Sequence, residues 1–260
     1  MITGASAGLG AEFARQLAPH ASALILAARR TDRLDALKAE FAATHPRLRV
    51  QCYSIDLTDP LAIEEFVRWI WDEGFRVHVL INNAGLGDHG PFENSDWAKV
   101  KSMLDVNVSA LTKLTHHLLP MLRGHRHAAI LNVSSTVGFL PMPHLAVYAA
   151  TKAYVTSFSE ALRAELRGTR ISVTALCPGP VDTEFSEVAS RGGTGMRSPD
   201  FLKVGPERVV RSALCAVASD RARVLPGWQI ALIVLTLASL PMFLLRVFLG
   251  MAAARERQAE

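Results

Sequence analysis

The sequence predicts a doubly wound parallel sheet, a three-layer α/β fold with helices on both faces, followed by an apolar helical tail. Two observations lead to this prediction. Short, nearly continuous apolar runs of strand length alternate with segments of helical length along the 260 residues. Apolar runs of this kind are typical of strands buried on both faces, as in parallel sheets. No linker rich in proline, glycine or serine divides the chain. We therefore expect one domain, residues 1–227, and a tail, residues 228–260.

The alternation sets the expected elements in order. The strands are expected at 23–28, 50–55, 77–82, 128–134 and 171–177. The helices are expected at 9–18, 33–43, 61–74, 97–124 and 148–168. Gly124 and Gly168 end the last two helical patterns, as helix stop signals predict. A first strand should precede the glycine-rich turn, yet only Met1 and Ile2 stand there. Either the natural start lies upstream, or this strand is cut short.

Charge excludes some functions. The chain carries 28 basic and 24 acidic residues, a formal net charge of +4. This surplus is too small and too dispersed for nucleic-acid binding, although it suits an anionic ligand or a membrane surface. The histidines at "HH" (His116) and in "GHRH" lack a carboxylate or thiol arrangement of metal-site type, so no metal is expected.

A glycine-rich turn, "TGASAGLG", follows the first strand and opens the first helix. Gly4, Gly8 and Gly10 allow a tight turn and close approach of the backbone to a pyrophosphate, and the helix offers free amides to its charge. Ser6 and Leu9 belong to the same turn. The spacing departs from G-x-G-x-x-G, and the alternative is a simple strand–helix connection. In a doubly wound sheet ligands bind at the carboxyl ends of strands, where this turn lies.

The second strand ends in "AARR". Dinucleotide sites use an acidic residue at this place for the ribose 2′-hydroxyl, whereas arginine accommodates a 2′-phosphate. Arg29 and Arg30 stand there with no carboxylate before Asp32, which favours NADP over NAD. The alternative is a solvated pair at the start of a loop.

Three more strand ends hold polar or small residues. Asp56, after the third strand, either accepts from the adenine amino group or caps the helix that begins near Pro60; the sequence leaves both open. After the fourth strand, "NNAG" (Asn82–Gly85) lets the backbone pass beneath a flat cofactor. The fifth strand ends in "NVSS", and "YAATK" follows after a loop. Residues four apart on a helix share a face, so the tips of Tyr148 and Lys152 can converge.

From Met1 to Gly227 the ordered set of these motifs resembles the short-chain dehydrogenase/reductase family in its single-domain, Rossmann-like form. The set comprises TGASAGLG, DL at Asp56, NNAG, Asn107, SS at Ser134–Ser135, YAATK and PGPVDT at Pro178–Thr183. Each motif is weak alone, but their joint occurrence in order is specific. The resemblance also implies a homo-oligomer.

The family pattern implies a role for each matching residue. Tyr148 would be the general acid/base and Lys152 its partner. Ser135, rather than Ser134, has the family's separation from the tyrosine and would bind the substrate oxygen. Asn107 would support a water-mediated proton relay to the lysine. The remaining implied contacts, all to NADP(H) and additional to the glycine-rich turn and the arginines, are Asp56, Leu57, Asn83, Ala84, Gly85, Tyr148, Lys152, Pro178, Gly179, Val181 and Thr183.

These residue types suit hydride chemistry. Hydride transfer to a carbonyl leaves an alkoxide that needs a proton, and a free phenol has a pKa near ~10. A cation beside the phenol would lower that pKa, so we expect Lys152 to lower the pKa of Tyr148. The cofactor carries the hydride, while the protein supplies position and proton.

The substrate is expected to be an apolar carbonyl or alcohol. Residues 183–206 match the family's substrate lid. The loop before Tyr148 offers a possible apolar wall, which could equally be core or subunit contact: Phe139, Leu140, Met142 and Leu145.

The tail allows three interpretations. Residues 228–249 are nearly all apolar, interrupted by Pro241 and Arg246. They could span or insert into a membrane, lie on it as two helices hinged at Pro241 with Trp228 at the headgroups, or pack against the domain or a partner subunit. We favour contact with a membrane, with the domain on the cytoplasmic side. The basic residues expected to meet anionic headgroups are Arg221, Arg223, Arg246, Arg255 and Arg257.

The first hypothesis for function is therefore an NADP(H)-dependent oxidoreductase that acts on a lipophilic carbonyl/alcohol pair. A second is a weakly catalytic nucleotide sensor that docks a membrane partner through the tail. The presence of both Tyr148 and Lys152 disfavours the sensor. A third is a nucleotide-sugar epimerase or dehydratase of the same fold, disfavoured because few residues follow Thr183 outside the tail.

Overall fold

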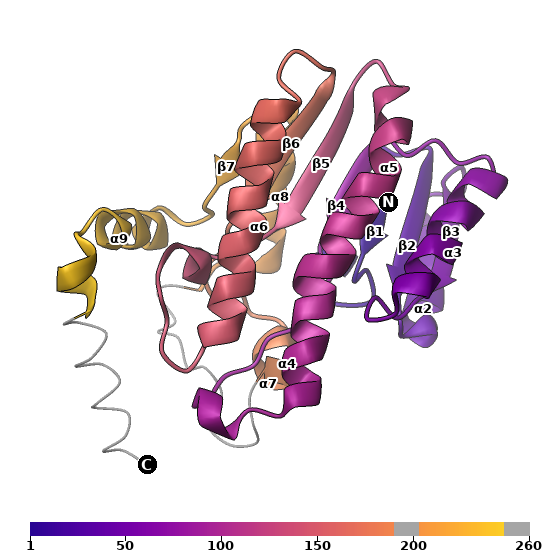
Figure 1. The fold of residues 1–260 in the computed structure, drawn as a ribbon. Helices are drawn as coiled ribbons and strands as arrows, with labels where there is room; N and C mark the ends of the chain where they lie inside the picture. Colours follow the sequence, from indigo (N-terminus) through magenta and orange to yellow (C-terminus); the bar gives the residue numbers. More distant parts are fainter. Residues whose placement is uncertain (190–202, 247–260) are drawn as a thin grey trace.

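A computed structural model describes residues 1–189 and 203–246. Seven parallel strands form one sheet in the order β3-β2-β1-β4-β5-β6-β7, covered by helices on both faces (Figure 1). The strands are β1 (Ile2–Thr3), β2 (Ala23–Ala28), β3 (Arg49–Ser54), β4 (Val79–Asn82), β5 (Ala128–Val133), β6 (Ile171–Leu176) and β7 (Arg223–Val224). The doubly wound sheet predicted from the apolar runs is confirmed.

Two apolar cores lie on the two faces of the sheet, because successive strand residues point to opposite sides. On β2, Ile25 and Ala27 join the first core, while Leu24, Leu26 and Ala28 join the second. The first core is covered by α3 (Pro60–Asp72), α5 (Leu111–Arg123) and α6 (Ala146–Glu165). The second is covered by α1 (Gly8–Leu17), α2 (Thr31–Thr44) and α8 (Pro206–Ala218).

The short first strand lies inside the sheet, between β2 and β4. Its pairing continues one residue beyond β1, since Ile81 N–H donates to the Met1 carbonyl at 2.9 Å and the Met1 amino group donates to the Val79 carbonyl at 2.8 Å. The chain runs outward from β1 to β2 and β3 and then returns to β4 on the other side of β1. This reversal opens a crevice at the carboxyl ends of β1 and β4, the place where such sheets bind ligands.

The expected helix 97–124 is helical throughout but not uniform. It consists of α4 (Trp97–Leu104), a π-helical segment (Asp105–Ala110) and α5. Such wide turns occur mostly as single-turn insertions in α-helices, frequently at functional sites, and this one holds Asn107. The helices α7 (Phe185–Ala189) and α8 and the edge strand β7 were not predicted. The strand escaped prediction because it has only two residues, one of them charged.

The segment after Gly227 begins with α9 (Trp228–Ala238), which lies beside the β7 edge of the sheet (Figure 1). The helix ends before Pro241, and residues 242–246 are helical again. Ile230 and Val234 face the domain and are buried, whereas Trp228 is 71% exposed. Within residues 1–189 and 203–246, no helix is both long and apolar enough to cross a membrane. The predictions for lid residues 190–202 and for Arg255 and Arg257 lie outside the described residues.

Candidate active site

The glycine-rich turn folds tightly against the end of β4. Gly4 and Gly8 have positive φ angles of 64° and 52°, which L side chains rarely adopt. A Cβ on Gly10 would stand only 2.2 Å from the Gly4 carbonyl oxygen. The Asn83 side chain donates to the carbonyls of Thr3 and Gly4, at 2.9 and 3.2 Å. The start of α1 therefore faces the crevice with an alanine as its N-cap, which leaves its first amides available to an anion.

The first residue of the "NNAG" segment, Asn82, holds neighbouring elements together, whereas its last residue, Gly85, lines the crevice. Asn82 is buried and its amide donates to Thr115 Oγ1 at 3.0 Å and to Asn132 Oδ1 at 2.8 Å. Gly85 lies between two polar side chains: a Cβ there would stand 3.3 Å from Lys152 Nζ and 3.4 Å from Asn107 Oδ1. This narrow passage explains why a residue without a side chain stands at position 85.

Asn107 joins three elements through its side-chain amide. Its Oδ1 accepts from the Leu86 N–H at 2.8 Å, and its Nδ2 donates to the Leu86 carbonyl at 2.9 Å and to Thr151 Oγ1 at 3.0 Å. The π-helical turn thus fixes the chain after β4 to α6. These bonds place Asn107 near Lys152.

Tyr148 and Lys152 lie one turn apart on α6 and are both buried. Lys152 Nζ donates to the Val133 carbonyl at 2.8 Å and stands 5.7 Å from the centre of the Tyr148 ring. Burial lowers the pKa of Lys152 to about 8. It raises the pKa of Tyr148 to about 12, and a hydrogen bond with Ser135 offsets part of this rise. The expected lowering of the phenol pKa by the lysine was therefore wrong, because burial raises this pKa and only the hydrogen bond with Ser135 offsets part of the rise.

The two serines after β5 point in different directions. The Ser134 hydroxyl donates to the Lys152 carbonyl at 2.8 Å and contacts Thr156 Oγ1 at 2.7 Å, so it holds α6 to the sheet. The Ser135 hydroxyl lies beside the Tyr148 phenol and accepts from the Val137 N–H at 3.3 Å. Ser135, the serine selected from the sequence, is thus the one that shares the site with the phenol.

The "PGPVDT" loop lies across the crevice from the glycine-rich turn. A Cβ on Gly8 would stand 3.4 Å from Thr183 Cβ, and one on Gly179 would stand 3.0 Å from Ile230 Cγ1. Val181 forms an isolated bridge with Val204, and the Pro178 carbonyl accepts from the Thr136 N–H at 2.9 Å. The loop is therefore held between the turn, the chain after β5 and α9.

The hydrogen bonds at the end of β3 exclude one of the two roles considered for Asp56, that of helix cap. The N-cap of α3 is Asp59, which accepts from the Leu61 N–H at 2.8 Å. Asp56 instead accepts from the Thr58 N–H and hydroxyl, both at 2.9 Å, and these bonds lower the pKa of its carboxyl. Asp56 therefore does not cap the helix, while Leu57 is buried in the first core.

The end of β2 brings together more charges than the sequence indicated. Arg30 Nε donates to Ser6 Oγ at 3.3 Å, and its Nη1 pairs with Glu184 at 3.1 Å. Arg33, which was not predicted, pairs with the same carboxylate at 2.6 Å. Its position in the sequence could have indicated this role, because Arg33 lies in the first turn of α2, which starts directly after the end of the strand.

Together these residues fit a phosphorylated dinucleotide. Glycines line the crevice at positions where a Cβ atom would clash with neighbouring atoms. The first amides of α1 are available to an anion. The guanidinium groups of Arg30 and Arg33 lie at the end of β2. NADP(H) would be held by these groups, with Lys152 and Asn107 near its reactive end.

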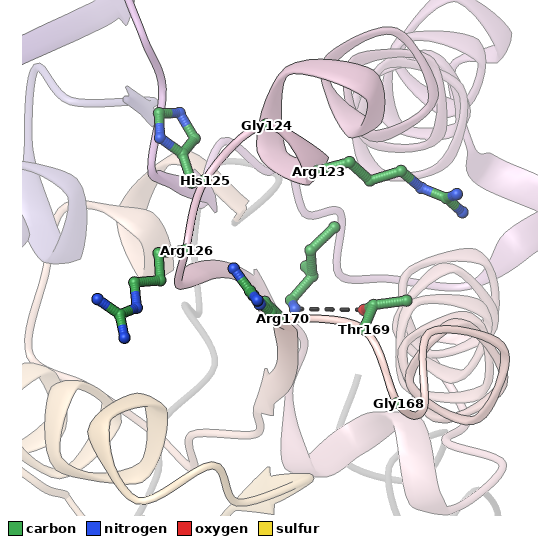
Figure 2. A pocket seen from close by; sticks show the side chains of 8 residues that line it. Arg123, Gly124, His125, Arg126, Gly168, Thr169 and Arg170 are labelled. Atoms are coloured by element: carbon green, nitrogen blue, oxygen red, sulfur yellow. Dashed lines mark hydrogen bonds between the residues drawn. The ribbon is translucent and has the colours of Figure 1, made fainter.

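A separate hollow of about 550 Å³ lies at the amino ends of the strands, between the chain before β5 and the chain before β6. Arg123 and Arg126 point to opposite sides there (Figure 2). The arginines of this hollow do not converge on one point, and the hollow is remote from Tyr148.

Comparison with known proteins agrees with this arrangement. The short chain dehydrogenase family model matches residues 1–192. The sulfoacetaldehyde reductase of Chromohalobacter salexigens is 40% identical over 197 residues, 74% of this chain and 75% of the relative. The human very-long-chain 3-oxoacyl-CoA reductase is 30% identical over 227 residues, 84% of this chain and 67% of the relative. The structure resembles a short-chain dehydrogenase from Sphingobium yanoikuyae in complex with NADPH, with a TM-score of 0.80, 31% identity and 88% coverage of both chains.

Proposed function

Because the chain belongs to the short-chain dehydrogenase family, we propose that it is an NADP(H)-dependent oxidoreductase that interconverts a carbonyl and an alcohol on a lipophilic small molecule. The observation that carries this proposal is that Lys152 and Asn107 flank Gly85, while Ser135 hydrogen-bonds Tyr148, one helical turn before Lys152. The cofactor, when bound, supplies or accepts the hydride.

The protein's part is position and proton. In reduction, Ser135 and Tyr148 hydrogen-bond the carbonyl oxygen, and Tyr148 gives its phenolic proton to the alkoxide as it forms. A pKa of about 12 keeps that phenol protonated at neutral pH, which suits the reductive direction in particular. Lys152 would hold the nicotinamide ribose, and Asn107 would support return of the proton toward Lys152.

Support for a lipophilic substrate comes from the surroundings of Tyr148. Its ring packs with Met103 and Leu145, and Met142 lies against the same cluster. Phe185, at the start of α7 (Phe185–Ala189), stands 5.6 Å from the Tyr148 ring, measured between centroids. The two named relatives reduce very different molecules, sulfoacetaldehyde and a very-long-chain 3-oxoacyl-CoA, so they share a carbonyl substrate and no more. The apolar walls favour the longer, less polar class.

We also propose that α9 lies on a membrane surface, close to the mouth of the site. Ile230 fixes the helix to Gly179, while Leu232 and Phe243 stay 61% and 64% exposed. Apolar side chains exposed together usually mark a contact surface. Arg246 and Arg221 remain candidates for headgroup contact. Arg223 does not: it pairs with Glu160 at 2.6 Å and lies over the Phe139 ring.

The function is tested by following NADPH oxidation with aldehydes and ketones of increasing chain length. We expect turnover that increases with chain length. Tyr148→Phe should lower kcat by about 10²-fold or more, because it removes the proton donor and leaves the crevice intact. Its affinity for NADPH should stay unchanged.

Tyr154→Phe is the matched control on the same helix. Its hydroxyl contacts Thr112 Oγ1 at 2.9 Å rather than the crevice, so the control should keep full activity. Substantial activity in Tyr148→Phe would contradict the proposed mechanism, and no turnover by the native protein with any carbonyl would contradict the function itself.

A further inference from the structure

The carboxylate of Glu184 occupies a site made by two arginines at the end of β2. It pairs through one oxygen with Arg30 at 3.1 Å and through the other with Arg33 at 2.6 Å. Both pairs join segments about 150 residues apart in the sequence. The two guanidinium groups therefore face the same point, and an anion already stands there.

The position of this point relates it to the cofactor. Arg30 Nε also donates to Ser6 Oγ in the glycine-rich turn, at 3.3 Å. The point thus lies beside the turn and at the end of the second strand, where an arginine accommodates a ribose 2′-phosphate. Arginine forks bind carboxylate and phosphate oxygens with the same geometry, so the two anions would compete for one site.

We propose that Arg33 joins Arg30 as a 2′-phosphate-binding residue, and that Glu184 fills this phosphate site until NADP(H) displaces it. This inference deepens the proposed cofactor site and rests on it. When the 2′-phosphate binds, its charge takes the place of the Glu184 carboxylate on both arginines. NADH carries no 2′-phosphate, so it does not compete with Glu184 for the two arginines. The Glu184 carboxylate should therefore lower the affinity for NADPH and leave the affinity for NADH unchanged.

The exchange also reaches the catalytic end of the crevice. Thr183, before Glu184, lies against Gly8, and Phe185, after it, packs near the Tyr148 ring. Phe185 also lies close to Gly87, where a Cβ would stand 2.7 Å from the Phe185 ring. Release of Glu184 would therefore free the segment that covers Tyr148, so that occupation of the phosphate site opens the way to the phenol.

The size of the effect follows from the exposure of these pairs. The side chains of Arg30, Arg33 and Glu184 are 41–45% exposed, and solvent screens ion pairs of this kind. Removal of the competing carboxylate should therefore tighten binding by a modest factor, on the order of 3- to 10-fold.

The test measures binding to the purified cofactor-free chain by calorimetry, with four probes: NADPH, NADH, adenosine 2′,5′-bisphosphate and AMP. The last two lack nicotinamide, so they report on the phosphate site without catalysis. Glu184→Gln should bind NADPH and the bisphosphate about 3- to 10-fold more tightly, with NADH and AMP unchanged. Arg33→Gln should bind the same two phosphorylated probes about 5- to 10-fold more weakly, again with NADH and AMP unchanged.

Glu40→Gln and Arg15→Gln are matched controls. They break an exposed Glu–Arg pair at 2.9 Å between α1 and α2, away from the crevice, and should change no affinity. Unchanged NADPH affinity in Glu184→Gln or weaker binding would overturn the competition. Equal tightening of NADH would show that Glu184 only blocks the crevice, and unchanged affinity in Arg33→Gln would remove Arg33 from the site. A native chain that binds neither NADPH nor NADH would instead overturn the proposed function.

Discussion

Tyr148 and Lys152 are both removed from solvent, and burial moves their pKa values in opposite directions. Burial disfavours the charged form of each group, so the pKa of the phenol rises to about 12 and that of the ammonium falls to about 8. The hydrogen bond with Ser135 offsets part of the rise at Tyr148. A cationic lysine that is ready for an anionic or hydroxylated ligand therefore costs stability when that ligand is absent.

Lys152→Met should make the cofactor-free protein more stable at neutral pH. A folded-state pKa of about 8 against 10.5 for the free group corresponds to a cost of about 3 kcal/mol, and the lost charge-assisted bond to Val133 offsets about half of it, which leaves a gain of about 1–2 kcal/mol in the free energy of unfolding. Below pH 8 both states are protonated and the full cost is present. Between about pH 8 and 10.5 the unfolded chain holds more protons than the folded one, so the cost disappears as pH rises.

Urea unfolding of both proteins across this pH range measures the effect. The difference between Lys152→Met and the native chain should shrink from about pH 8 to pH 10.5, the range in which Lys152 titrates. The variant should also lose NADPH affinity. A less stable variant at neutral pH would contradict this account of Lys152.

At the scale of elements, the turn between β1 and α1 packs closely against the end of β4. Gly10 is tight through its surroundings rather than through its own backbone, because the obstacle to a Cβ is the Gly4 carbonyl oxygen at 2.2 Å. Gly74, between α3 and β4, is the opposite case: its φ is 68°, and no atom lies within 4 Å of a Cβ built there. The two glycines therefore separate steric crowding from backbone strain.

Gly10→Ala should destabilise the protein by about 2–3 kcal/mol and weaken NADPH binding at least about tenfold, because the added methyl must move the turn that faces the phosphates. Gly74→Ala should cost about 1 kcal/mol through its positive φ and leave NADPH binding unchanged. Urea unfolding and NADPH titration measure both. Equal NADPH affinities for the two variants would show that the turn tolerates a shift and that its tightness is not needed for the cofactor.

At the scale of the whole molecule, α9 attaches an apolar surface to a domain that is otherwise complete. Ile230 and Val234 are 9% and 5% exposed and fix the helix, whereas Trp228, Leu232 and Phe243 are 71%, 61% and 64% exposed. The inward and outward residues can therefore be changed separately. The proposed contact is with the surface of a bilayer, into which such exposed apolar side chains would insert.

A triple variant, Trp228→Gln, Leu232→Gln and Phe243→Gln, should abolish sedimentation with vesicles of phosphatidylglycerol and phosphatidylcholine. The native chain should sediment with them, because these side chains supply the apolar contact. NADPH binding by the variant should stay unchanged, since Ile230 still holds Gly179. Ile230→Val is the matched control and should sediment as the native chain does. A native chain that stays in solution as a stable oligomer beside vesicles would show that these side chains meet a partner subunit instead.

The sequence by itself determined the layered sheet, because continuous apolar runs can be buried on both faces only in a parallel sheet covered by helices. It also indicated the residues around the crevice, because the carboxyl ends of parallel strands, here "NNAG" and "NVSS", lie at the same end of the sheet. Local patterns could not reveal β7, a two-residue edge strand that exists only through pairing with β6. Nor could they show the π-helical turn at Asn107, which the amphipathic pattern of a continuous helix conceals.

Only the tertiary structure decided how the charges are used. The approach of Glu184 to Arg30 and Arg33 depends on the path of the chain after β6, and no spacing in the sequence reports it. The pKa of Tyr148 is set by burial among the packed elements and by the hydrogen bond with Ser135, whereas the spacing of Tyr148 and Lys152 alone suggested an effect of the lysine. Burial and long-range contacts are properties of the packed chain. Residue types can therefore indicate where a site lies, whereas the fold determines the pKa values and ion pairs of its residues.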